Sequence, residues 1–224
     1  MMEWLTALLL GGVVGLDATS FPQAMYSRPF VAGALGGLVV GRPVEGALIG
    51  VLLEFFSLPI LPFGAAGYPE GGTAAVASTV AYVWATDGFH PDMLFLAVSF
   101  GLVLSHVSGY SVRLLRIRNG RAVGQGDQAA PIEPRSVERG HLLAMGLDFL
   151  RGALVTAVGT ALMAICLFAA SHSGWALPLA SINVLGVATL AMIGGSLTIF
   201  GTVRERLVSF VLGAAATAVA VWVL

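Results

Sequence analysis

Long apolar segments follow one another from residue 92 to residue 224. A bilayer core about 30 Å thick requires roughly 20 apolar residues for each spanning helix. Segments of about this length lie at 92–110, 141–170, 177–201 and 207–224. This pattern predicts an all-α integral membrane protein with several transmembrane helices.

The first ninety residues have a different pattern, because glycine, proline and charged residues divide them into shorter apolar pieces. These pieces are 4–16, 30–41, 44–63 and 72–85. Only the third has the length of a span, and glutamates and prolines interrupt it. We therefore expect short re-entrant or broken helices in the N-terminal third. Irregular backbone at membrane depth must be buried in protein or line a cavity, and transporters bind substrates at such breaks.

Arginines gather in one polar segment between the two halves. All 11 basic residues of the chain are arginines, and six of them lie between positions 113 and 139. The positive-inside rule predicts that this segment is cytoplasmic. We expect one membrane domain with three parts: a broken-helix substrate-binding and transport region over 1–110, a cytoplasmic arginine-rich loop over 111–140, and a transmembrane helical region over 141–224.

Composition excludes several classes of function. Hydrophobic residues make up 57% of the chain and charged residues 10%, and the formal net charge of −1 argues against nucleic acid as a partner. The single cysteine, Cys166, cannot form an internal disulfide, and the four histidines lack the spacing of metal ligands. We expect no metal and no cofactor. The apolar N-terminus carries Glu3 instead of a basic region, so we expect it to remain in the folded chain.

Four polar residues lie within or beside the short apolar pieces, and they are Asp17, Gln23, Arg28 and Glu54. An ionisable group at membrane depth costs at least ~2.5 kcal/mol unless it is paired or hydrated. Carboxylates and glutamine supply the acceptors and donors that sugar hydroxyls need, so the set suits a sugar. Glu54, near the end of one broken segment, is the leading candidate. The alternative is that Asp17 and Arg28 form an ion pair or lie at an interface.

The segment 63–69, FGAAGYP, is too rich in glycine and proline for a helix interior. The small side chains of Gly64, Ala65 and Ala66 would expose backbone N–H and C=O groups to a ligand. A tight turn is the alternative interpretation of the glycines.

A stripe of small residues follows one short segment, because Gly33, Gly37 and Gly41 recur at every fourth position. Such a stripe lets two helices approach closely, and helix packing is its default interpretation. A sliding transport domain would also need a smooth face of this kind.

Four motifs follow one another in the first third of the chain. They read LDATSFPQ at 16–23, SRPFVAG at 27–33, GALIGVLLE at 46–54 and FGAA at 63–66. Together they resemble successive signatures of the IIC component of phosphotransferase systems of the mannose/fructose/sorbose type. The resemblance is densest between residues 16 and 81, and the order of the motifs makes it more specific than any one of them.

The resemblance implies a sugar-translocating subunit in the bacterial inner membrane that acts on a hexose or amino sugar. Such a subunit pairs with a IID membrane subunit in an oligomer of IIC–IID units, while soluble IIA and IIB proteins carry phosphate on their own histidines. This chain would have no phosphoryl-carrying or catalytic residue. It would move the sugar by an elevator-like shift and present it to IIB at the cytoplasmic face. Carried over by motif, the sugar site comprises Asp17, Gln23, Arg28, Glu54, Gly64, Ala65 and Ala66, with Glu54 accepting sugar hydroxyls.

Two other functions stay open on the residues alone. An ion-coupled secondary transporter would use Asp17 and Glu54 in its substrate or ion site, since broken helices and buried carboxylates also describe that class. A structural or assembly subunit of a membrane complex would leave these carboxylates without a role. Dependence on partner proteins distinguishes the phosphotransferase subunit from the secondary transporter.

Overall fold

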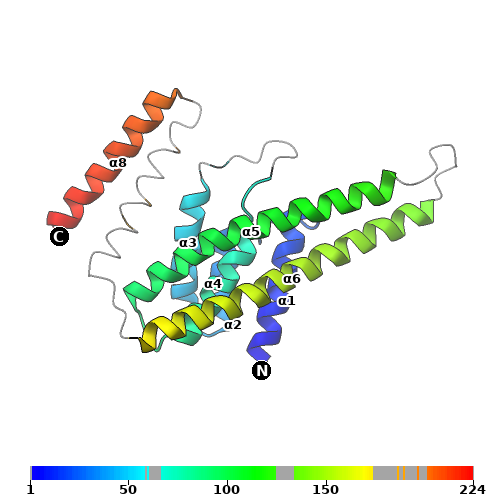
Figure 1. Ribbon diagram of the computed structural model, residues 1–224, viewed down its shortest axis with the longest axis horizontal. Helices are drawn as coiled ribbons and strands as arrows, with labels where there is room; N and C mark the ends of the chain where they lie inside the picture. Colours follow the sequence, from blue (N-terminus) through cyan, green and yellow to red (C-terminus); the bar gives the residue numbers. More distant parts are fainter. Residues whose placement is uncertain are drawn as a thin grey trace.

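The computed structural model of the chain describes residues 2–58, 60, 67–124, 134–173, 186, 189, 196 and 201–223. These described residues form helices and contain no strand, which confirms the all-α class (Figure 1). The helices are α1 (Met2–Thr19), α2 (Pro29–Val39), α3 (Pro43–Ser57), α4 (Gly71–Ala85), α5 (Pro91–Gly124), α6 (Pro134–His172) and α8 (Val203–Val223).

Three helices of the described residues are long and apolar enough to cross a membrane. They are Met2–Thr19, Pro91–Gly120 and Val137–His172. The last two correspond to the spans predicted at 92–110 and 141–170. The expectation that the first apolar piece is too short is wrong, because the helix extends beyond 4–16 at both ends and reaches 18 residues. Helix α8 overlaps the span predicted at 207–224, and nearly all of 177–201 lies outside the described residues.

The short helices predicted in the N-terminal third are confirmed. Helix α2 has 11 residues, and α3 and α4 have 15 each, so all three are shorter than the ~20 residues of a span. Proline occupies the first position of α2 and α3, where its fixed φ and missing N–H suit a helix start. Helix α3 ends at Ser57 rather than continuing to 63, because prolines follow at positions 59 and 62.

Helix α4 is the centre of the fold. Every residue from Gly72 to Tyr82 is buried, and α1, α2, α3, α5 and α6 all contact this helix. Its sequence, GGTAAVASTVAYVWA, is mostly small residues, which let the surrounding helices approach its backbone. A core of this kind needs no long aliphatic side chains on the central helix.

Glycines join α2 to α3. A Cβ on Gly33 would lie 2.5 Å from the carbonyl oxygen of Gly46 and 2.8 Å from Cα of Gly50, so the two backbones touch. Gly37 approaches Gly46 from the same face, and the helix-packing interpretation of these two positions is confirmed. Gly41 has a different role, because its φ of +76° forms the turn between the helices.

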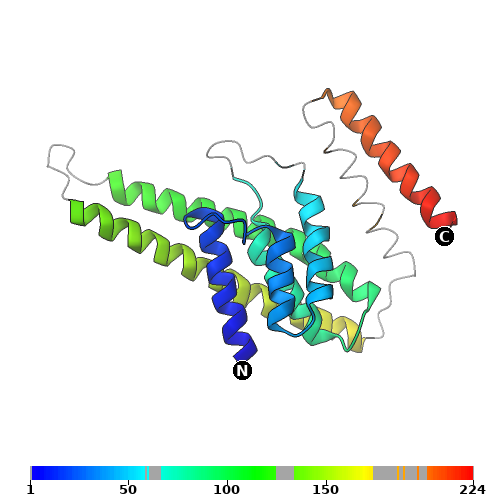
Figure 2. The same ribbon diagram turned by 180° about the vertical axis from the view of Figure 1, so that it is seen from behind.

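Helices α5 and α6 run side by side and form a long arm beyond the short helices (Figures 1 and 2). At 1.5 Å per residue their 34 and 39 residues extend for about 51 and 58 Å, well beyond the hydrocarbon core. The expectation of a loop over 111–140 is therefore wrong in its extent, because α5 continues to Gly124 and α6 begins at Pro134. Arginine, leucine and glutamate are good helix formers, so a rise in polarity ends the apolar region without ending the helix.

Candidate functional site

Asp17 organises the connection between α1 and α2. Its side chain is buried, with 2% exposed. One carboxylate oxygen accepts a hydrogen bond from the backbone N–H of Ala24 at 2.6 Å, and the other accepts one from Ser27 at 2.8 Å. The carboxylate therefore fixes the loop that leads to Arg28, and the alternative of an Asp17–Arg28 ion pair is wrong. This role is positional, since the two oxygens already face backbone donors.

Arg28 pairs with Glu54, which comes from α3. The distance between Arg28 Nη1 and Glu54 Oε1 is 3.0 Å, and 58% of the arginine side chain and 19% of the glutamate side chain are exposed. The other carboxylate oxygen accepts a hydrogen bond from the backbone N–H of Phe30 at 3.4 Å. This N–H belongs to the first turn of α2, where donors lack partners within the helix and a negative charge is favoured.

The ion pair lies on the wall of an open groove between α2 and α3. The groove has a volume of about 360 Å³ and is lined by Met25, Arg28, Phe30, Val31, Val51, Glu54 and Phe55. A volume in this range suits a small ligand, and a few polar groups among apolar walls are typical of such sites. The groove offers a carboxylate acceptor, a guanidinium donor and two aromatic side chains.

The structure brings together only part of the predicted sugar site. Gln23 has φ of +59° in the α1–α2 connection, and its exposed side chain is absent from the described lining of the groove. Asp17 lies behind the loop as its support. Gly64, Ala65 and Ala66 lie outside the described residues.

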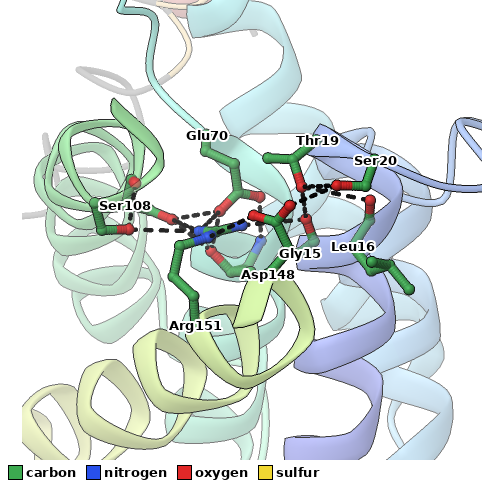
Figure 3. Close-up of polar contacts among 10 residues, drawn as sticks. Gly15, Leu16, Thr19, Ser20, Glu70, Ser108, Asp148 and Arg151 are labelled. Carbon is green, nitrogen blue, oxygen red and sulfur yellow. Dashed lines mark hydrogen bonds and ion pairs between the residues drawn. The ribbon is translucent and has the colours of Figure 1, made fainter. Parts of the chain in front are cut away.

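A second group of charges, which the sequence analysis missed, is buried where α1, α4, α5 and α6 meet (Figure 3). Arg151 of α6 lies 3.7 Å from Glu70, which precedes α4, and 3.7 Å from Asp148 on its own helix. The exposed fractions are 9% for the arginine, 4% for the glutamate and 7% for the aspartate. We refer to Glu70, Asp148 and Arg151 as the buried charge cluster.

Neutral donors complete the surroundings of both carboxylates. Glu70 accepts hydrogen bonds from the backbone N–H and the hydroxyl of Thr73 and from the hydroxyl of Ser108. Asp148 accepts a hydrogen bond of 2.5 Å from the hydroxyl of Ser20. A buried charge needs both a partner and such hydrogen bonds to offset its desolvation.

Arg151 connects the cluster to the backbone of α1. Its Nη2 donates to the carbonyl oxygen of Gly15 at 3.1 Å, and its Nη1 lies 3.4 Å from the hydroxyl oxygens of Ser108 and Ser111 on α5. Figure 3 shows its guanidinium group pointing into the space between these helices. One side chain thus links α6 to α1, α5 and the start of α4.

The signal for this cluster was present in the sequence. Asp148 and Arg151 interrupt the apolar segment 141–170 at a spacing of three, which places them on one helix face. Glu70 lies three residues before Thr73, at the start of an apolar run, and it caps α4 through that N–H. The cost of an unpaired charge at membrane depth, which singles out Asp17 and Glu54, applies equally to these residues. They lie outside the broken segments in which a site was expected.

Comparison with known proteins gives a family and a fold. Residues 1–221 match the family model described as the PTS system sorbose-specific IIC component. A solved structure titled "Structure of membrane protein" has a TM-score of 0.69 to this chain at 16% sequence identity, over 89% of this chain and 78% of that chain. A search of curated proteins found no match. The structural likeness supports the fold alone, at this level of identity.

Proposed function

The chain belongs to the family of sorbose-specific IIC components of the phosphotransferase system, and from this premise we propose that it binds a hexose or amino sugar in the groove between α2 and α3. It is a sugar-transporting membrane subunit of the mannose type, as the resemblance of its motifs implied. In the proposal, the bound sugar is presented to a IIB protein and phosphorylated at the cytoplasmic face.

The exposed ion pair between Arg28 and Glu54 carries this proposal. A ligand can reach both side chains, whereas the buried charge cluster has 4–9% exposure and is paired within the protein. Glu54 would accept hydrogen bonds from sugar hydroxyls, and Arg28 would donate to hydroxyl or ring oxygens. Phe30 and Phe55 would cover the apolar face of the sugar. Asp17 would act indirectly, by holding the loop that positions Arg28.

The partners in the proposal are a IID membrane subunit, with which the chain forms an oligomer, and soluble IIA and IIB phosphate carriers. The bacterial inner membrane is the proposed location. The arginines at the ends of α5 and α6 support a cytoplasmic position for the arm, because cytoplasmic segments are enriched in arginine and lysine. Close packing of glycines between α2 and α3 supports movement of these two helices as one unit during an elevator-like shift.

Vesicles that contain the chain with IID and phosphorylated IIB provide the test. We expect phosphorylated sugar inside the vesicles only when both partners are present, and at least a tenfold loss of this product for Glu54→Gln. Glu45→Gln is the matched control, because Glu45 is also ion-paired on α3 but lies outside the groove lining. We expect this control to retain the native rate.

Two outcomes would contradict the proposal. Accumulation of unmodified solute without partners, driven by an ion gradient, would replace it with the secondary transporter. Equal rates for Glu54→Gln and Glu45→Gln would remove the groove from the sugar site while leaving the family assignment intact.

A further inference from the structure

A second cavity lies between the end of α1 and the middle of α5, next to the buried charge cluster. Its volume is about 330 Å³, and it is separate from the groove that carries Glu54. It is lined by Ala18, Thr19, Gly67, Tyr68, Glu70, Gly109, Val112, Arg113, Arg116 and Ile117. The proposed sugar site uses none of these residues.

Two arginines give this cavity a positive charge. Arg113 and Arg116 are three positions apart on α5, so their side chains leave the same face of the helix. Among the described residues, no carboxylate lies within ion-pair distance of either guanidinium. Arg116 lies over the ring of Tyr68, with 5.9 Å between the guanidinium carbon and the ring centroid.

The acidic residue in the lining does not neutralise these arginines. Glu70 is 4% exposed, and its carboxylate already accepts hydrogen bonds from Thr73 and Ser108 and faces Arg151 at 3.7 Å. Its carboxylate oxygens therefore already have partners within the protein. The cavity thus has two positive side chains at one end that form no ion pair with the residues that the structure describes.

Two carbonyl groups near the end of α1 have hydrogen-bond donors within the protein. The oxygen of Gly15 accepts hydrogen bonds from Arg151 and Thr19, and the oxygen of Leu16 accepts from the backbone N–H of Ser20. These donors offset part of the negative charge at this end of the helix. An anion that enters meets the arginines and the hydroxyl-bearing residues of the lining.

A span that begins at the first residue of α5 reaches these arginines after about the thickness of the hydrocarbon core. Arg113 follows Pro91, the first residue of α5, by 113 − 91 = 22 positions, or about 33 Å along the helix. The hydrocarbon core is about 30 Å thick. We therefore expect the cavity to lie near the water interface of the arginine-rich side, where a charged ligand can enter without crossing lipid.

We propose that this cavity binds a phosphate group through Arg113 and Arg116. Arginine matches the geometry of phosphate oxygens with two parallel N–H donors, and two arginines on one helix face can share one phosphate. The phosphate belongs either to a phosphorylated sugar or to the headgroup of an anionic phospholipid. The first source rests on the proposed function, because a phosphorylated sugar is the product of that reaction, and the second source is independent of it.

Binding to the purified protein in detergent tests the phosphate site. The probes are a hexose 6-phosphate, the unphosphorylated hexose and inorganic phosphate, titrated against native protein and the double variant Arg113→Gln/Arg116→Gln. We expect hexose 6-phosphate to bind the double variant at least tenfold more weakly than the native protein. Arg118→Gln is the matched control, since Arg118 is on the same helix but outside the described lining of the cavity, and its affinity should be native.

Lipid bilayers distinguish the two sources of phosphate. In bilayers of phosphatidylcholine with and without phosphatidylglycerol, a headgroup site predicts that phosphatidylglycerol raises the melting temperature of native protein and of Arg118→Gln but not of the double variant. Binding of hexose 6-phosphate without this lipid effect assigns the site to the sugar product.

One set of results would contradict a phosphate site in this cavity. If neither hexose 6-phosphate, inorganic phosphate nor phosphatidylglycerol distinguishes the double variant from Arg118→Gln, the cavity does not recognise phosphate. Both arginines are exposed, so the variants are expected to fold, and Arg113→Lys with Arg116→Lys keeps the charge and should keep part of the binding. Glu54→Gln separates this result from the proposed function, because it should weaken binding of the unphosphorylated hexose and leave inorganic phosphate unaffected.

Discussion

Two sets of charged residues in this protein have the same chemistry and opposite surroundings. Arg28 and Glu54 form an ion pair on an open groove, with 58% and 19% of their side chains exposed. The buried charge cluster of Glu70, Asp148 and Arg151 has 4–9% exposure and joins helices that are distant in the sequence. A charge that a ligand can reach is suited to binding, and a buried charge paired within the protein is suited to stabilising the fold.

The two sets of charged residues also differ in their contribution to the stability of the fold. An exposed ion pair contributes about 0–1 kcal/mol, because water competes with the partner and the side chains lose rotational freedom. Removal of one partner from a buried pair costs about 3–5 kcal/mol, since an uncompensated charge stays behind in the protein interior. The comparison therefore predicts that substitutions in the cluster act on stability and substitutions in the groove act on transport.

The largest effect is expected for Arg151→Met. This substitution leaves Glu70 and Asp148 buried without their cation, and we expect it to destabilise the fold by about 3–5 kcal/mol. Unfolding of the detergent-solubilised protein, monitored by circular dichroism, measures the change. Arg28→Met is the control and should cost less than about 1 kcal/mol.

Neutralising the carboxylates sharpens this prediction. In the Arg151→Met background, Glu70→Gln together with Asp148→Asn removes the unpaired charges, and we expect partial recovery of stability. If Arg151→Met and Arg28→Met unfold at the same temperature, buried and exposed charges do not differ in their contribution to the stability of this protein.

The next largest effect is expected for Asp17→Asn. The amide replaces one of the two oxygens that accept from Ala24 and Ser27 by a donor, so one buried hydrogen bond is lost. The cost of such an unsatisfied group is about 1–3 kcal/mol. Thermal unfolding should show this loss of stability. The affinity for the sugar should fall as well, because the loop that positions Arg28 loses one of its two hydrogen bonds to Asp17. Asp87→Asn, at an exposed position, should change neither quantity.

Gly33→Ala tests the packing on which the groove depends. Its Cβ would lie 2.5 Å from the carbonyl oxygen of Gly46, so α2 and α3 must separate, at a cost of about 1–3 kcal/mol. Gly36→Ala is the matched control on the same helix, because its nearest contact would be an ordinary 3.4 Å to Val76. A shared melting temperature for the two variants would contradict close packing between α2 and α3.

Much of the helical arrangement was predictable from the sequence, because apolar segments and prolines report directly on helix starts and on contact with lipid. The error at α1 came from treating Asp17 as the end of an apolar segment. Its carboxylate is satisfied by backbone donors of the following loop, so the helix continues to Thr19. A hydropathy pattern contains no information about such hydrogen-bond donors.

The candidate site was predictable in part. Glu54 and Arg28 were selected because charge is costly among apolar residues, but their pairing joins positions 26 apart and required the packing of α2 on α3. Arg151 was missed because its segment has the length of an ordinary span, and its partner Glu70 comes from a segment 81 positions earlier, by 151 − 70. The cost of a buried charge is evident in one sequence, whereas the partner that offsets it depends on the tertiary fold.

A small effect is expected for the ion pair of Arg42 and Glu45, whose side chains are 19% and 23% exposed. Hydrogen bonds from Arg42 lower the pKa of Glu45 below its ordinary value of 4.5. A lowered pKa in the folded state gives stability that is present above the ordinary pKa and is lost as pH falls through the folded-state pKa. Native protein and Glu45→Gln should therefore differ by less than about 1 kcal/mol at pH 7, and their unfolding temperatures should converge in acid below about pH 4. A difference that widens in acid would mean that Glu45 stabilises the fold in its protonated form, which contradicts a contribution from its ion pair.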